Sequence, residues 1–152
     1  MASSTGIGII RLMRSHTACH ILSAVIFRET GARITGNQID LNRSRVDFNL
    51  ENFDEEEMRN YIDKANQILK EDLPLHIKEF PRAEAIKIPD LARLAIGIPE
   101  VEKIRVVEIE GIDLQACGGT HIKSIGEVRE ITMTKAENKG KFNRRIYFSL
   151  EG

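Results

Sequence analysis

The chain has 152 residues, of which 41% are hydrophobic and 30% charged, and its formal net charge is −1. This balance is typical of one globular domain that buries a core without disulfides, and it excludes a uniformly basic nucleic-acid binder. No apolar run approaches the ~20 residues that cross a bilayer. Because there are only two cysteines, we expect the reducing cytoplasm rather than a disulfide scaffold.

The first predicted element is a helix over residues 11–29, where apolar residues recur at helical spacing and Gly31 supplies a stop. Residues 1–10 do not have the pattern of a signal peptide. We interpret them as an extraneous or disordered segment, which leaves 11–152 as one domain. Two strands are predicted next, at 33–41 and 45–49.

A second long helix is predicted to begin after Asp54, with Glu57 completing a capping-box pattern, and to end before Pro74. The remaining predicted elements are strands at 75–80, 104–109, 128–134 and 145–150, a short helix at 81–85, and an ambiguous segment at 89–99 with one or two helical turns. This order predicts an α+β fold, a two-layer sandwich in which a mostly antiparallel sheet packs under two long helices.

Two short motifs contain both cysteines and three of the four histidines. His16 and His20 are four residues apart, so a helix places them on one face. Cys117 and His121 flank a Gly-Gly-Thr segment whose glycines allow a sharp bend. Together the four side chains predict a Zn²⁺ site. The alternative, a buried thiol with surface imidazoles, leaves the glycines unexplained.

Two further residues of these types are interpreted differently. Cys19 borders the metal-binding face of the helix by helical geometry, and we expect it to be a wall of the pocket rather than a ligand. His76 falls in a predicted edge strand, where we expect an exposed side chain.

The motif pair resembles the editing domain of alanyl-tRNA synthetase and the free-standing AlaX editing proteins. The residues that carry the resemblance are His16-Thr17-Ala18-Cys19-His20 and Cys117-Gly118-Gly119-Thr120-His121, with further likeness at 36–48, 105–109 and 144–146. The resemblance implies the two-layer fold shared with the threonyl-tRNA synthetase editing domain. It also implies zinc bound by the four motif residues, and hydrolysis of the ester that joins serine, and also glycine, to tRNA(Ala).

Two departures from the family accompany the resemblance. Longer members carry a β-barrel ahead of this domain, which nothing before Arg11 resembles. Cys19 stands where the family often has threonine, and residues 35–37 occupy the region of a family glutamine.

Roles in the reaction follow from the chemistry of ester hydrolysis. The backbone N–H groups of Gly118 and Gly119 are expected to stabilise the oxyanion. The polar residues Thr35, Asn37 and Gln115 are candidates for reading a serine hydroxyl. The residues expected to bind tRNA phosphates are Arg11, Arg14, Lys135, Lys139, Lys141, Arg144 and Arg145.

Three functions are open at this point. The first is a trans-editing hydrolase of mischarged Ser-tRNA(Ala), with Gly-tRNA(Ala) as a further substrate. The second is a zinc hydrolase of small esters or amides, which would act without tRNA. The third is a zinc-stapled RNA-binding module with no turnover, in which the metal only holds distant segments together.

Overall fold

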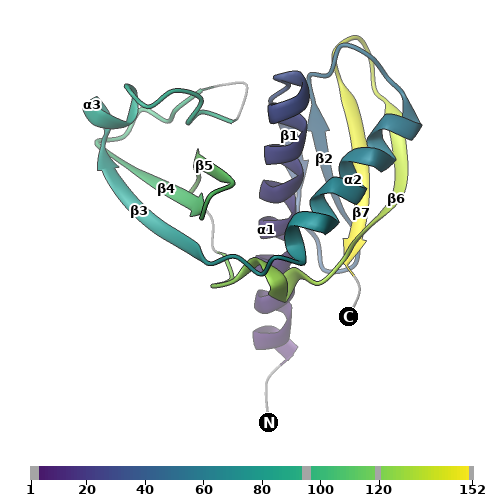
Figure 1. Cartoon of the computed structure of the whole chain (residues 1–152), viewed down its shortest axis with the longest axis horizontal. Helices are drawn as coiled ribbons and strands as arrows, with labels where there is room; N and C mark the ends of the chain where they lie inside the picture. The colour runs from purple at the N-terminus through teal and green to yellow at the C-terminus, as the bar shows by residue number, and fades with distance from the viewer. Residues whose placement is uncertain (1–3, 94–96, 119–120, 151–152) are drawn as a thin grey trace.

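The computed structural model describes residues 4–93, 97–118 and 121–150. Its elements are labelled in Figure 1: α1 (Ser4–Thr30), β1 (Ile34–Gln38), β2 (Ser44–Phe48), α2 (Glu55–Leu69), β3 (Leu75–Pro81), α3 (Arg82–Ala85), β4 (Lys103–Ile109), β5 (Asp113–Ala116), the 3₁₀ turn η1 (Ile125–Val128), β6 (Ile131–Asn138) and β7 (Arg144–Leu150). No helix in these ranges is both long and apolar enough to cross a membrane.

The strands form two antiparallel sheets. One has four strands in the order β1-β2-β7-β6, and the other has three in the order β3-β4-β5. The predicted α+β class with antiparallel strands is therefore confirmed. Its division into two sheets was not predicted, because a strand pattern does not say which edges pair. The two-layer arrangement stays a prediction.

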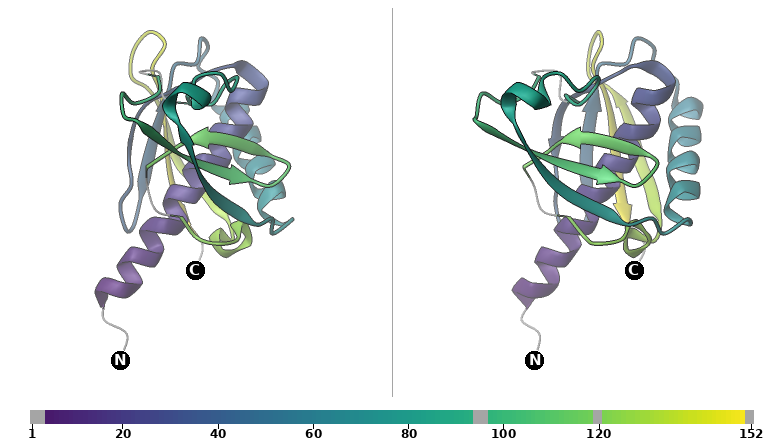
Figure 2. Two further views of the ribbon diagram at one scale, coloured as in Figure 1. Left: turned by 90° about the vertical axis from the view of Figure 1, so that its left-hand side faces the viewer. Right: turned by 60° about the vertical axis from the view of Figure 1, so that its left-hand side comes forward.

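Helix α1 lies between the two sheets. Figure 2 shows the three-stranded sheet in front of α1 and the four-stranded sheet behind it, with α2 alongside. Ile21, Leu22 and Ile26 of α1 are fully buried, in one core with Phe48 of β2 and Phe148 of β7. This core also takes in residues of α2 and β4. The helix that carries His16 and His20 is thus held on several sides.

The central strand of the smaller sheet, β4, is apolar on both faces. Val107 and Ile109 pack into the main core, while Ile104 and Val106 pack with Ala85 and Leu91 in a second, smaller cluster. Arg105 and Glu108 interrupt the apolar residues of this strand, so its burial on both faces does not appear as a continuous apolar run. The small cluster supports β5 and the residues that follow it.

Several boundaries differ from the prediction. Helix α1 begins at Ser4 rather than at residue 11, so its first turns precede the predicted start; the separate status of residues 1–10 stays a prediction. It ends at Thr30, and Gly31 has a φ of +78°, which confirms the predicted stop. Asp54 caps α2 as predicted, although its side chain accepts from the Glu56 N–H.

The second half of the chain departs further from the pattern. Residues 113–116, for which no strand was predicted, form β5. The strand predicted from residue 128 begins at Ile131 because η1 precedes it. That strand then runs to Asn138, beyond its predicted end at residue 134, which leaves five residues before β7. The described part of 89–99 contains no helix; residues 94–96 lie outside the description.

Candidate metal centre

The structure brings the four predicted ligand residues together. His16 and His20 project from α1, and Cys117 and His121 come from the segment directly after β5. One ligand atom from each residue lies within 4.8 Å of all the others. Cys117 Sγ is 3.4 Å from His16 Nε2 and 3.6 Å from His121 Nε2. The predicted cluster is confirmed, whereas the identity of its ion stays a prediction.

The electrostatics of the cluster suit a metal cation. Burial, then the neighbouring His121 and His16, holds the pKa of His20 well below its ordinary value of 6.5. Burial, with His16 and Arg105, lowers the pKa of His121 to about 3. Both rings are therefore neutral at pH 7, as metal binding requires. Three imidazoles and one thiol are a donor set that zinc accepts.

One buried atom supports the same assignment. His20 is 4% exposed, and its Nδ1 has no hydrogen-bond partner among the described residues. A buried imidazole nitrogen without a partner is uncommon, because its desolvation is uncompensated. The donor set, the lowered pKa values of His20 and His121, and the unpartnered nitrogen of His20 all fit a Zn²⁺ ion. It would be held by His16, His20, Cys117 and His121.

Strand β5 is fixed against α1 by a polar network. Gln115 is buried, and its side-chain amide donates to the backbone carbonyl of His20 at 3.4 Å and to the carboxylate of Asp113. Asp113 also accepts two bonds, of 2.7 and 3.2 Å, from the buried guanidinium of Arg93. Arg93 in turn stacks over Phe27 of α1 at 4.3 Å. Gln115 is thus engaged in positioning the ligand helix.

The segment that follows His121 is anchored as well. Arg14 donates to the carbonyls of Glu127 and Val128 at 2.8 and 3.1 Å, which ties η1 to α1. Thr17, between the two helical histidines, places its hydroxyl 2.9 Å from His121 Nδ1.

The sequence analysis missed Thr17, Arg93 and Asp113. Only Thr17 had a usable signal, since it lies inside the His16/His20 motif.

The other candidate catalytic residues are distributed unevenly around the cluster. Cys19 is outside the ligand set, as predicted, but it packs in the hydrophobic core at 1% exposure. Burial raises the pKa of its thiol to about 12. Gly118 lines a hollow of about 200 Å³ together with Cys117 and Arg105. Gly119 lies outside the described residues.

Thr35 and Asn37 are exposed residues of β1. The Thr35 hydroxyl donates to the side chain of Asn143, in the turn between β6 and β7, at 3.3 Å. No hydrogen bond in the described chain joins either residue to the cluster. Their predicted role in reading the substrate stays a prediction.

The predicted phosphate-binding residues divide into two groups. Arg14 and Arg144 are 9% and 8% exposed, and their guanidinium groups bond to carbonyls inside the fold. Both are therefore structural anchors, because a buried guanidinium with internal acceptors is not presented to a phosphate. The group whose side chains reach the surface comprises Arg11, Lys135, Lys139, Lys141 and Arg145, of which Lys135 and Lys139 pair with Glu137.

A second basic surface combines Arg145, which the sequence analysis proposed, with Arg43 and Arg45, which it did not. Arg43, Arg45 and Arg145 surround Tyr147 and line a hollow of about 770 Å³. Arg43 stacks on the Tyr147 ring at 4.3 Å, and Arg45 and Arg145 share the carboxylate of Asp47. We call these four residues, Arg43, Arg45, Arg145 and Tyr147, the arginine surface. Register places Arg45 opposite Tyr147 across the β2–β7 pair, a contact that no spacing in the sequence reveals.

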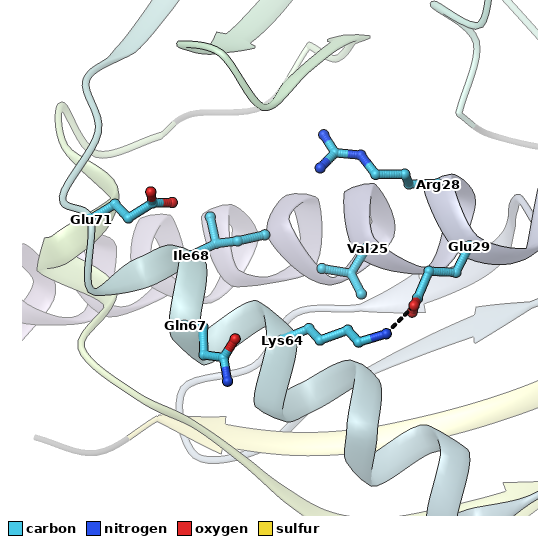
Figure 3. Close-up of a pocket in the computed structure, with 7 residues that line it drawn as sticks. All are labelled: Val25, Arg28, Glu29, Lys64, Gln67, Ile68 and Glu71. Atoms are coloured by element: carbon cyan, nitrogen blue, oxygen red, sulfur yellow. Dashed lines mark hydrogen bonds and ion pairs between the residues drawn. The ribbon is translucent and has the colours of Figure 1, made fainter.

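A separate hollow of about 470 Å³ lies between α1 and α2 (Figure 3). Val25 and Ile68 point into it, and an ion pair between Lys64 and Glu29 crosses one side. None of the four cluster residues lines it. This hollow is therefore a helix–helix groove distinct from the metal centre.

Known proteins match the chain over most of its length. The threonyl and alanyl tRNA synthetase second additional domain matches residues 104–147. The alanyl-tRNA editing protein AlaX-M of Methanosarcina acetivorans is 49% identical over 142 residues, which are 92% of this chain and 58% of that protein. AlaX-M of Saccharolobus solfataricus is 44% identical, over 93% of this chain and 59% of that protein.

Alanine–tRNA ligases match as well. The enzyme of Methanococcus maripaludis strain C7 is 31% identical over 143 residues, which are 92% of this chain and 16% of the ligase. The chain thus spans a little more than half the length of the AlaX-M proteins it matches and a small part of the ligases. These matches confirm the resemblance drawn from the two motifs: the chain is similar to the alanyl-tRNA editing proteins AlaX-M and, over a small part of their length, to alanine–tRNA ligases.

Proposed function

We propose that the chain is an aminoacyl-tRNA deacylase that hydrolyses the ester joining serine, and also glycine, to tRNA(Ala), with Zn²⁺ as its cofactor. The observation that carries this proposal is the convergence of His16, His20, Cys117 and His121 to within 4.8 Å across about a hundred residues of chain. Homology to alanyl-tRNA editing proteins supports the substrate class. Both cysteines are free, which accords with a cytoplasmic location.

The neutral imidazoles and the Cys117 thiol would hold the ion, and the ion when bound would act as a Lewis acid that polarises a carbonyl and activates water. Gly118 has open space where a Cβ would lie, so an ester can approach its backbone closely. The hollow beside it is about 200 Å³, which suits a small aminoacyl group better than a bulky one. Arg105, in the same hollow, supplies positive charge where oxyanion charge would develop.

For tRNA binding, we propose the arginine surface in place of the buried Arg14 and Arg144. Arg43 has no carboxylate partner in the described chain, and two arginines share the single Asp47. The surface therefore carries excess positive charge beside a stacked tyrosine, a combination that binds RNA phosphates and bases. A small neighbouring hollow contains Arg43 together with Arg11, a further residue expected to bind phosphates.

The test is hydrolysis of Ser-tRNA(Ala), Gly-tRNA(Ala) and correctly charged Ala-tRNA(Ala), each with zinc and with a chelator. We expect rapid zinc-dependent loss of serine, slower loss of glycine and retention of alanine. Full activity in chelator would contradict the metal role. Equal hydrolysis of a seryl ester without tRNA would favour a small-ester hydrolase, and zinc binding without any turnover would favour an RNA-binding module.

The arginine surface has its own test. Arg43→Gln should raise the KM for Ser-tRNA(Ala). It should also reduce the slope of log affinity against log salt concentration by about 1, which corresponds to the loss of one phosphate contact. Lys103→Gln is the matched control, because it removes one charge from an exposed residue of the other sheet. Equal KM values and salt slopes for the two variants would contradict the proposed surface while leaving the deacylase proposal intact.

A further inference from the structure

The Thr17 hydroxyl lies between a helix carbonyl and a predicted metal ligand. Thr17 is fully buried on α1, and its Oγ1 is 3.0 Å from the Met13 carbonyl oxygen and 2.9 Å from His121 Nδ1. His121 is 104 residues away in the sequence. The hydroxyl therefore links the helix that holds two ligands to the loop that holds the other two.

The direction of these two hydrogen bonds follows from their chemistry. A threonine hydroxyl has one proton, and the Met13 carbonyl can only accept. If the proton pointed to His121 instead, Oγ1 and the carbonyl oxygen would face each other at 3.0 Å as two acceptors. The consistent arrangement is that Thr17 donates to Met13 and accepts from an Nδ1–H of His121. The charge of Arg105 also acts on His121. Because a guanidinium contains no acceptor atom, Arg105 cannot accept the Nδ1–H bond in place of Thr17.

The tautomer has a consequence for the ligand atom. A neutral imidazole with its proton on Nδ1 has its lone pair on Nε2. His121 Nε2 is the atom that lies 3.6 Å from Cys117 Sγ, on the side of the cluster. The Nδ1–H bond therefore leaves the correct nitrogen free and fixes the orientation of the ring, as hydrogen bonds to metal-binding histidines commonly do.

We infer that Thr17 is a positioning residue, which selects the Nδ1–H tautomer of His121 and aims its Nε2 at the metal. This inference rests on the proposed metal site and adds to it a residue that binds neither metal nor substrate. A plain structural reading, in which Thr17 merely bonds back to its own helix, accounts for the Met13 contact but not for the His121 contact.

The experiment measures Zn²⁺ affinity by competition with a chromophoric chelator, for the wild type and three variants. Thr17→Val keeps the side-chain shape but leaves the buried Nδ1–H without an acceptor, so affinity should fall about 10-fold or more. Thr17→Ser restores the hydroxyl and should stay close to wild type. Thr30→Val is the matched control on α1, since Thr30 also donates to a helix carbonyl, that of Ile26, without touching a ligand.

A second readout does not depend on any variant folding. Long-range ¹H–¹⁵N correlation spectra of the metal-free wild type should show His121 protonated on Nδ1 at neutral pH. Protonation on Nε2, or equal zinc affinity in wild type and Thr17→Val, would overturn the inference. A wild type that binds no zinc would instead overturn the proposed function, so the two failures are distinguishable.

Discussion

The two sheets on either side of α1 are built for different tasks. In the four-stranded sheet, Val46, Phe48, Ile146 and Phe148 are all fully buried against the helices. In the three-stranded sheet, β5 instead carries polar side chains towards α1, and the described chain continues from it directly into Cys117. The first sheet contributes mainly burial, whereas the second adds directed hydrogen bonds from β5 to the apolar packing of β4.

The difference teaches where a site of this kind can form. Apolar burial is favourable but non-directional, so it can hold α1 in place without specifying the angle of an imidazole. Hydrogen bonds from Gln115 and Thr17 are directional, and they act on the backbone of His20 and on the ring of His121. Stability and ligand geometry should therefore respond to different substitutions.

The largest expected effect is on the metal centre itself. Cys117→Ser should reduce Zn²⁺ affinity by more than about 100-fold, since even changes behind the ligands cost about 10- to 100-fold. Deacylation should fall with it. Cys19→Ala, in the core, should retain zinc binding and lose only about 1 kcal/mol of stability for a small cavity. Comparable loss of metal in both variants would show that the core and the centre are not separable.

A large effect on stability is expected from the four-stranded sheet. Phe148→Ala should lower the free energy of unfolding by about 3–5 kcal/mol, because it leaves a cavity under α1. Ile77→Ala on β3, where the side chain is 46% exposed, should change it by less than about 0.5 kcal/mol. Urea unfolding in excess chelator measures both. Similar costs would contradict the contrast between the sheets.

Acid should destabilise the metal-free protein gradually. His121 has a pKa of about 3 when folded and an ordinary value of 6.5 when unfolded, and the pKa of His20 is shifted in the same direction. Between these values the unfolded state binds more protons, so stability present above about pH 6.5 is lost as pH falls towards 3. Urea midpoints at several pH values would show this slope.

Two variants identify the groups that cause this loss of stability in acid. His121→Asn should make the pH dependence of the urea midpoint shallower, because one titrating group is removed from the buried centre. His76→Gln is the control, since it removes an imidazole outside the buried centre, exposed on β3 as predicted for an edge-strand residue. An unchanged slope in His121→Asn would assign the acid sensitivity to other groups.

The smallest perturbation is chemical labelling of the native protein. Iodoacetamide should modify Cys117 in the metal-free protein near pH 8, and bound Zn²⁺ should protect it. Cys19 should react only after unfolding, because it is buried and its pKa is raised to about 12. Mass spectrometry of the labelled peptides distinguishes the two thiols. Native labelling of Cys19 would mean that the core around α1 opens readily.

Some features were predictable because they depend on local spacing. The i, i+4 relation of His16 and His20 places them on one face of any helix that forms there, and Gly31 ends that helix by adopting a positive φ. The pairing of this motif with Cys117 and His121 was predictable from residue chemistry, since few other groups in the chain could complete a zinc site.

The sequence by itself thus determined the main helices, most strands, the α+β class and the four residues of the candidate metal centre. Only the tertiary structure decided that the strands form two sheets, that Gln115 bonds to His20, that Thr17 meets His121, and that Arg14 and Arg144 turn inward. These outcomes depend on strand register and on contacts between residues far apart in the chain, which local periodicity does not encode. The arginine surface belongs to the same class, because pairing between β2 and β7 assembles it.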